Sequence, residues 1–175
     1  MTAQEAYELT THGGASDFAR LIAACESFGP YCLIGGLAVN CFVDPVYTLD
    51  ADIVVIAATL PELAAHLQQQ GFKIEQHPYS LNALAPGSQL RIQFSTDERY
   101  QAFLDRAIDA EVLGVLAKVA CLEDIARGKL WAYGDEHRRL SKRKKDELDL
   151  IRLAEKYPDL RTLYPKELRE IIERG

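Results

Sequence analysis

The feature that most constrains the fold is a pair of aspartates leading directly into an apolar strand. Residues 53–56 read Ile-Val-Val-Ile, an uninterrupted β-branched run typical of a strand buried on both faces of a sheet. Asp50 and Asp52 stand just before it, and because side chains alternate along a strand, both carboxylates are expected on one face. Two carboxylates so close repel each other unless a cation lies between them or one takes up a proton. The pattern therefore predicts either a cation site or a solvated strand end.

A second constraint lies upstream, where a short apolar segment meets two glycines. Residues 31–34 are predicted to form a strand that runs into Gly35 and Gly36. Two glycines after a strand let the backbone turn tightly and approach a ligand such as a phosphate. Residues 37–43 then read as a short buried helix that ends at an Asp-Pro pair. A glycine pair alone is usually a turn, but strand, glycine pair, short helix and D-x-D in this order form a much more specific combination.

The order of the remaining elements predicts an α/β (α+β) protein with helices at its C-terminal end. We expect a mixed central sheet flanked by helices in residues 1–121, and a helical C-terminal part in residues 122–175 packed on that core. The other predicted elements are a helix from Ser16 capped by Ser16 or Asp17, a helix over 59–71, strands over 72–76 and 88–95, a loop or short irregular strand over 77–87, and helices from 122, over 136–156 and from 165.

Composition narrows the protein class. A chain of 175 residues suits one domain, or one core domain with a helical appendage. Its net charge of −6 argues against a general nucleic-acid coat protein. Its apolar stretches are far shorter than the ~20 residues that cross a bilayer, and its polar start does not resemble a secretory signal. The four cysteines include no C-x-x-C pair and the four histidines show no metal-ligand spacing. We therefore expect a cytoplasmic protein without membrane association, disulfides or a zinc site.

A basic segment interrupts this acidic chain. Residues 127–145 contain eight Lys or Arg residues against two acidic ones. Together with the upstream motif, this asymmetry favours a patch that faces phosphate, with a solvated basic helix face as the alternative. A nucleic-acid-binding module that uses this segment alone is a further interpretation, but it leaves the glycine pair and the D-x-D motif unexplained.

Together these motifs resemble the nucleotidyltransferase superfamily, whose fold is shared with DNA polymerase beta. The likeness is greatest to minimal bacterial members, including the abortive-infection (AbiEii-like) toxin nucleotidyltransferases, and covers about residues 31–153. It implies an enzyme that uses Mg²⁺ or Mn²⁺ to move a nucleoside monophosphate from an NTP to an RNA, protein or small-molecule acceptor. By this resemblance Asp50 and Asp52 are catalytic and hold the metal ions, which neutralise charge on the attacking and leaving oxygens.

The resemblance also implies a nucleotide-binding set and partners. Gly35 and Gly36 would lie at the triphosphate, Lys129 would reach it, and Asp146 would orient a basic neighbour. The nucleotide-binding residues expected in full are Gly35, Gly36, Thr48, Lys129, Lys142 and Asp146. The expected partners are an NTP, RNA or tRNA at the 127–145 segment, and a cognate antitoxin or partner protein.

Two positions depart from the family's pattern. An arginine often found four residues before the first aspartate is replaced here by Val46. A third carboxylate on a later strand aligns best with Gln93, whose carbonyl oxygen can ligate a metal but brings no negative charge. Asp97 is the alternative metal ligand if that strand ends early. These departures favour a second hypothesis, a non-catalytic protein of this fold that binds a nucleotide or a partner, as in a toxin–antitoxin pair.

Overall fold

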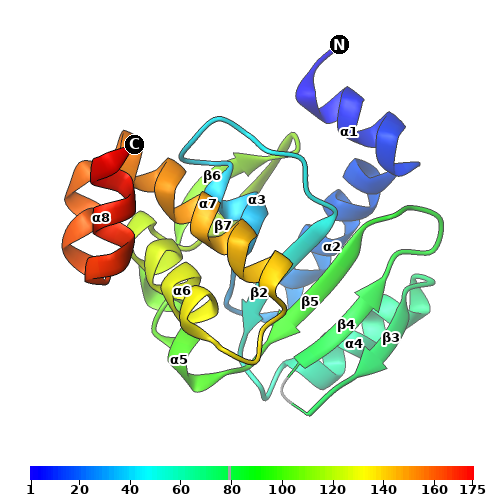
Figure 1. Ribbon diagram of the computed structural model, residues 1–175. Coiled ribbons are helices and arrows are strands. Elements are labelled where there is room, and N and C mark those ends of the chain that lie inside the picture. The colour runs from blue at the N-terminus through cyan, green and yellow to red at the C-terminus, as the bar shows by residue number, and fades with distance from the viewer. Residues whose placement is uncertain (79) are drawn as a thin grey trace.

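A mixed β-sheet forms the centre of the protein in a computed structural model that describes residues 1–78 and 80–175 (Figure 1). In this described part the sheet has seven strands in the order β3-β4-β5-β2-β1-β7-β6. The strands are β1 (Tyr31–Ile34), β2 (Asp50–Val55), β3 (Lys73–Gln76), β4 (Ser80–Leu84), β5 (Arg91–Ser95), β6 (Ile108–Val112) and β7 (Val115–Val119). β2 runs antiparallel to β1 and parallel to β5, so the strand that carries both aspartates lies in the middle of the sheet.

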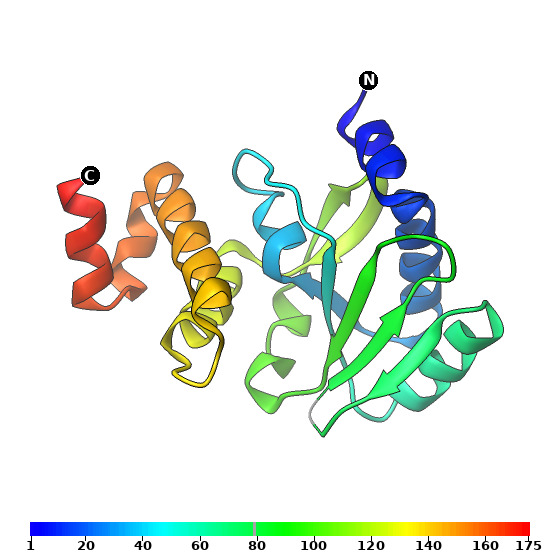
Figure 2. The same cartoon turned by 45° about the vertical axis from the view of Figure 1, so that its right-hand side comes forward.

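Helices cover the sheet from two sides. Figure 2 shows the N-terminal helices to the right of the sheet and the C-terminal helices to its left. The helices are α1 (Ala3–Thr11), α2 (Gly14–Phe28), α3 (Gly35–Val39), α4 (Leu60–Gln69), α5 (Glu98–Gln101), α6 (Leu122–Gly134), α7 (Leu140–Lys156) and α8 (Lys166–Arg174), with 3₁₀ turns η1 (Leu104–Arg106) and η2 (Pro158–Leu163). None of the helices that the structure describes is long and apolar enough to cross a membrane.

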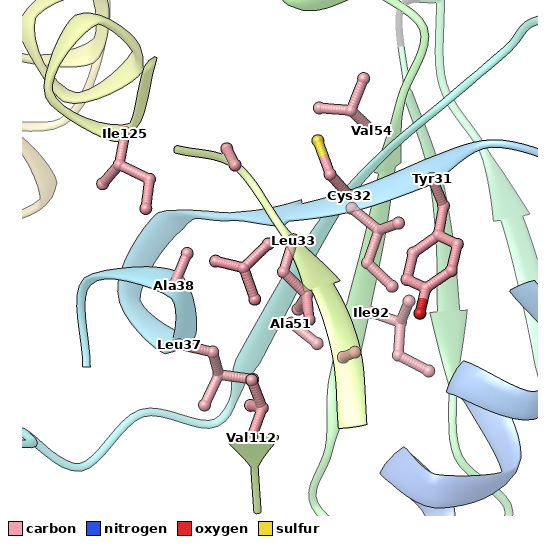
Figure 3. Packing of buried hydrophobic residues seen from close by; sticks show 14 of the residues in the cluster. Tyr31, Cys32, Leu33, Leu37, Ala38, Ala51, Val54, Ile92, Val112 and Ile125 are labelled. Carbon is pink, nitrogen blue, oxygen red and sulfur yellow. The ribbon is translucent and has the colours of Figure 1, made fainter. Parts of the chain in front are cut away.

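The core is built on the apolar run that the sequence predicts to be buried. Ile53 and Val54 of β2 are fully buried. Figure 3 shows Leu33 of β1 and Ala51 of β2 in one buried cluster with Leu37 of α3, the helix that follows β1. Burying a large aliphatic side chain contributes roughly 1.5–3 kcal/mol, so this central region holds the aspartate-bearing strand rigidly in place.

The structure confirms the predicted α/β class and corrects several boundaries. The short helix over 37–43 is α3, which begins at Gly35 and ends at Val39, so the glycine pair forms its first turn. The helix predicted from 136 begins at Leu140. Within the segment 77–87, β4 is a regular strand paired along its length with β5, and residue 79 lies outside the described residues.

The first helix of the predicted core also starts differently. α2 begins at Gly14 with Gly13 as its N-cap, and no side chain caps it, so the predicted cap at Ser16 or Asp17 is wrong. The Ser16 hydroxyl instead donates a hydrogen bond to Glu8 of α1. α1 is absent from the predicted elements, although it begins with a capping box between Thr2 and Glu5, which is a sequence signature of a helix start.

The C-terminal helices form a layer against α3. α6 begins at Leu122, the residue at which the sequence predicts the helical part to start. α7 buries Leu150 and Leu153 completely, and it contacts both α6 and η2. The boundary predicted between residues 121 and 122 therefore coincides with the start of a helix, and the division of the chain into two parts stays a prediction.

Candidate active site

The two aspartates lie side by side on one face of β2. Asp50 and Asp52 line a common cavity, as their spacing predicts. The register of the neighbouring strand places Arg91 opposite Asp50 and Gln93 opposite Asp52. The amide of Gln93 therefore stands beside the second aspartate, at the position where the sequence suggested a third metal ligand.

The glycine pair brings the backbone of α3 against this face. Gly35 has φ +72°, in the left-handed region that favours glycine, and a Cβ at this position would overlap the Asp52 carboxylate. A Cβ on Gly36 would lie 3.5 Å from the Thr48 side chain. Thr48 is buried, and its hydroxyl accepts hydrogen bonds from the Asp50 N–H at 3.3 Å and from Lys145 Nζ at 3.5 Å. Both glycines and Thr48 thus belong to one close-packed corner of the site.

The two carboxylates differ in their electrostatic surroundings. Asp50 Oδ1 pairs with Arg91 Nε at 2.7 Å, and Asp50 Oδ2 pairs with Lys142 Nζ at 3.2 Å. Although burial acts to raise the pKa of Asp50, Lys142 and Arg91 hold it below its usual value. Burial raises the pKa of Asp52 above its usual value, and the charge of Asp50 adds to the effect against the opposing charge of Lys129. The surroundings therefore favour the ionised form of Asp50, whereas burial disfavours the ionised form of Asp52, which an added cation would stabilise.

A buried ion-pair network joins α6 to α7. Lys129 Nζ pairs with Asp146 at 2.9 Å and with Asp149 at 2.7 Å, and these three side chains are at most 9% exposed. Arg138 pairs with Asp146 at 2.8 Å, and Arg152 pairs with Asp149 at 3.0 Å. Burial acts to lower the pKa of Lys129, but the two carboxylates raise it above its usual value, so the lysine stays charged. This network fixes α7 on α6.

The network changes the role expected for one sequence-predicted residue. Lys129 lines the site, but its ammonium group already forms ion pairs with two buried carboxylates. It is therefore poorly placed to neutralise the charge of a triphosphate. Asp146 accepts hydrogen bonds from two basic neighbours, Lys129 and Arg138, and its role in nucleotide binding stays a prediction. Lys142 and Lys145 instead present their charges to the aspartate corner.

The predicted site residues did not include Arg91 or Asp149, and Lys145 was placed only in the basic 127–145 segment. Arg91 gave no local signal, because only the β2–β5 register brings it to Asp50. Lys142, Lys145 and Asp149 recur at intervals of three and four along α7, the spacing of one helical face. That periodicity could have placed Lys145 and Asp149 on the same helical face as Lys142.

The site opens into two adjoining cavities. The smaller, of about 400 Å³, is lined by Gly36, Thr48, Asp50, Arg91, Lys142 and Lys145. The larger, of about 950 Å³, is lined by Gly35, Ser95, Asp97, Arg99, Tyr100 and Trp131. Asp52, Gln93, Lys129, Arg138 and Asp146 line both. The second aspartate thus stands between a cationic compartment and a larger one.

Aromatic rings form one wall of the larger cavity. Trp131 lies edge-on to Tyr100, with ring centroids 5.2 Å apart, and stacks on Phe103 at 5.7 Å. The Arg99 guanidinium lies over the Trp131 ring at 5.3 Å and pairs with Asp97 at 2.8 Å. The hydrogen bond from Arg99 lowers the pKa of Asp97. Asp97 therefore lines the cavity as an ionised carboxylate that an arginine already holds, which makes it a weaker candidate ligand than Gln93.

The donor set fits a hard divalent cation. Asp50, Asp52 and Gln93 offer oxygen atoms on adjacent strands, and oxygen is the ligand type that Mg²⁺ and Mn²⁺ prefer. Among residues 1–78 and 80–175, no group of three or more His, Cys, Asp or Glu side chains could hold a metal ion. At this corner the oxygen donors are two carboxylates and the Gln93 amide, so they do not make up such a group.

Comparison with known proteins identifies the fold. Neither a family model nor a curated protein matches the sequence. Among solved structures, ANT(2")-Ia in complex with adenylyl-2"-tobramycin superposes with a TM-score of 0.64 at 16% identity, covering 91% of this chain and 97% of that chain. The chain has the nucleotidyltransferase fold.

Two further solved structures are similar to this chain. JHP933 from Helicobacter pylori has a TM-score of 0.57 at 18% identity, covering 88% of this chain and 69% of that chain. An antigenic nucleotidyltransferase-like protein from Paracoccidioides brasiliensis has a TM-score of 0.56 at 19% identity, covering 81% of this chain and 75% of that chain. The resemblance inferred from the motifs is confirmed at the level of the fold, and the narrower abortive-infection branch stays a prediction.

Proposed function

We propose that this protein is a metal-dependent nucleotidyltransferase that transfers a nucleoside monophosphate from an NTP to a hydroxyl group of a small molecule. The observation that carries the proposal is the position of the aspartate pair, with cations on one side and a large cavity on the other. Phosphoryl-transfer enzymes act mainly by positioning and by charge neutralisation, and this arrangement offers both.

The smaller cavity suits the triphosphate. Arg91, Lys142 and Lys145 reach it from two different elements of the fold, and Gly36 leaves the backbone open to a close approach. Ammonium and guanidinium groups make strong charge-assisted hydrogen bonds to phosphate oxygens. In this proposal Lys142 keeps the phosphate-binding role expected from the sequence, Lys145 joins it, and Lys129 positions α7 instead.

The metal would be held by Asp50 and Asp52, with Gln93 as a neutral third ligand. When bound, Mg²⁺ or Mn²⁺ supplies neutralisation of charge on the attacking and leaving oxygens. Gly35 supports this assignment. A side chain at this position would overlap the Asp52 carboxylate, so glycine leaves the space around that carboxylate free.

The larger cavity suits the acceptor. Attacking and leaving oxygens lie roughly in line in phosphoryl transfer, so an acceptor opposite the cationic compartment would enter from the larger one. Its volume of about 950 Å³ falls within the roughly 300–1,000 Å³ of small-molecule sites. The acceptor oxygen would bond to the α-phosphorus, the α–β anhydride bond would break, pyrophosphate would leave with its electron pair, and the hydroxyl proton would pass to solvent. ANT(2")-Ia, crystallised with an adenylylated small molecule, supports this choice.

RNA has less support as the acceptor. Five of the eight cations of the 127–145 segment pair with carboxylates in the described part of the chain, namely Arg127, Lys129, Arg138, Lys142 and Lys144. A cation that is paired with a carboxylate of the same protein attracts the phosphate backbone of RNA less strongly than an unpaired cation does. The alternative of a non-catalytic protein that binds nucleotide or a partner rests on Gln93, which brings no third negative charge.

The test combines binding with transfer. The wild type and the Asp50→Asn/Asp52→Asn variant are titrated by calorimetry with each NTP and Mg²⁺, with the exposed Asp105→Asn change as a matched control. Each protein is then incubated with α-labelled NTPs and either a small-molecule extract or total RNA. We expect label in small molecules with the wild type and the control only. Equal nucleotide binding by the double variant contradicts the site, and binding without incorporation supports the non-catalytic alternative.

A further inference from the structure

Asp50 is already neutralised on both of its oxygens by side chains of this protein. Arg91 Nε lies 2.7 Å from Oδ1, and Lys142 Nζ lies 3.2 Å from Oδ2. Arg91 belongs to β5, the strand next to Asp50, whereas Lys142 belongs to the first turn of α7. A divalent ion that binds this carboxylate must therefore compete with a built-in cation.

We propose that Lys142 excludes a bare divalent cation from the aspartate pair and gives up its place only to a metal–nucleotide complex. The inference rests on the proposed function. An ammonium group beside Oδ2 repels an approaching metal ion, and moving it away costs the ion pair. A bound triphosphate provides other acceptors for the same ammonium group, so metal and phosphate would enter together.

Lys142 is better placed to move than Arg91. Lysine carries a compact charge on a flexible four-carbon chain, and the Lys142 side chain is 38% exposed. It faces the same cavity as Lys145, which lies one turn further along α7 beside Thr48. Phosphates in that cavity would therefore meet both ammonium groups at once. Arg91 would keep its ion pair with Oδ1 and so hold the carboxylate in position when Lys142 leaves Oδ2.

The helix backbone would stay fixed during this exchange. Asp146, four residues after Lys142, and Asp149 are tied to Lys129 of α6 by buried ion pairs. Residues four apart lie on one face of a helix, so the network anchors the turn that follows Lys142. The exchange then needs only a side-chain rotation, which exposed side chains complete in picoseconds to nanoseconds.

Direct metal binding tests the inference without a catalytic assay. Free Mn²⁺ is followed by electron paramagnetic resonance in titrations of the wild type, Lys142→Met and the control Lys144→Met, whose lysine pairs with Glu147 instead. The same proteins are titrated with Mn²⁺ and α,β-methylene analogues of the four NTPs. We expect Lys142→Met to bind Mn²⁺ alone about tenfold more tightly and the Mn²⁺–nucleotide complex about tenfold more weakly, with little change in the control.

The results distinguish failure of the Lys142 inference from failure of the proposed function. Unchanged or weaker Mn²⁺ binding by Lys142→Met, with the wild type still binding the Mn²⁺–nucleotide complex, overturns the inference and leaves the proposed function standing. A wild type that does not bind the complex, or an Asp50→Asn variant that binds it equally well, overturns the proposed function. Lys142→Arg keeps the charge and is expected to keep Mn²⁺ out, and Lys142→Gln repeats the charge removal should the Met variant fold poorly.

Discussion

Replacing Lys129 by Met tests whether the lysine supports the fold or binds the nucleotide. Its ammonium group lies between Asp146 and Asp149, with side chains 9%, 3% and 5% exposed. Removing one partner of a buried ion pair costs about 3–5 kcal/mol, because the remaining charge stays buried without compensation. Arg138 and Arg152 each keep one contact with these aspartates.

We therefore expect a loss at the lower end of that range, about 3 kcal/mol in the free energy of unfolding. For a chain of this size the melting temperature falls by roughly 6–12 °C. Urea unfolding followed by circular dichroism measures the change. The control is Lys144→Met, which removes a 64%-exposed lysine side chain from its pair with Glu147 and is expected to change stability by less than about 0.5 kcal/mol.

A double variant sharpens the test. Lys129→Met/Asp149→Asn removes both the cation and one of the two stranded carboxylates, so it is expected to be more stable than Lys129→Met alone by about 1 kcal/mol. The reasoning is refuted if Lys129→Met unfolds like the wild type but loses nucleotide affinity. That result would return Lys129 to the triphosphate-binding role that the sequence predicts.

The remaining predictions concern single positions. Gly35→Ala is expected to destabilise the protein by about 2 kcal/mol, from its positive φ and the overlap with Asp52; thermal unfolding checks it against Gly134→Ala, where the described residues leave a Cβ open space. Gln93→Glu adds a carboxylate beside Asp52 and is expected to tighten Mn²⁺ binding about tenfold, or 1.4 kcal/mol, as calorimetry would show; weaker binding would contradict the ligand assignment. Although burial raises the pKa of Asp124, hydrogen bonds to arginines hold it below its usual value. The ionised Asp124 carboxylate therefore stabilises the folded protein fully above about pH 4, the usual pKa of an aspartate. This stabilisation disappears as the pH falls through the lower pKa that Asp124 has in the folded protein. The stability gap between wild type and Asp124→Asn should shrink over that acid range, and a constant gap would contradict it.

Where neighbours along the chain decided the outcome, the sequence predicted the structure well. β2 is a buried strand, its two aspartates share a face, and the glycine pair follows β1 directly. These features depend on the alternation of side chains along one strand and on the conformational freedom of glycine. Both are local properties, so they can be read without knowing what packs nearby.

The β6–β7 hairpin shows where local signals failed. Its two-residue turn is Leu113-Gly114, with φ +49° and φ +79°. Two-residue turns of this kind usually have the sequence Asn-Gly or Asp-Gly, and a leucine with positive φ is uncommon. The pairing of β6 with β7 and the packing of Val112 in the core hold that residue in place, so tertiary contacts decided this turn.

The electrostatics of the site belonged to the tertiary structure alone. The sequence by itself determined the aspartate pair, the glycine pair and the fold class, because each is encoded in a short segment. It did not determine that Arg91 and Lys142 neutralise Asp50, or that Lys129 is held between two aspartates of α7. Those partners come from the register of β5 on β2 and from the packing of α6 against α7. The strength of an electrostatic interaction depends on the distance between the charges, and only the folded structure determines which charges lie close together.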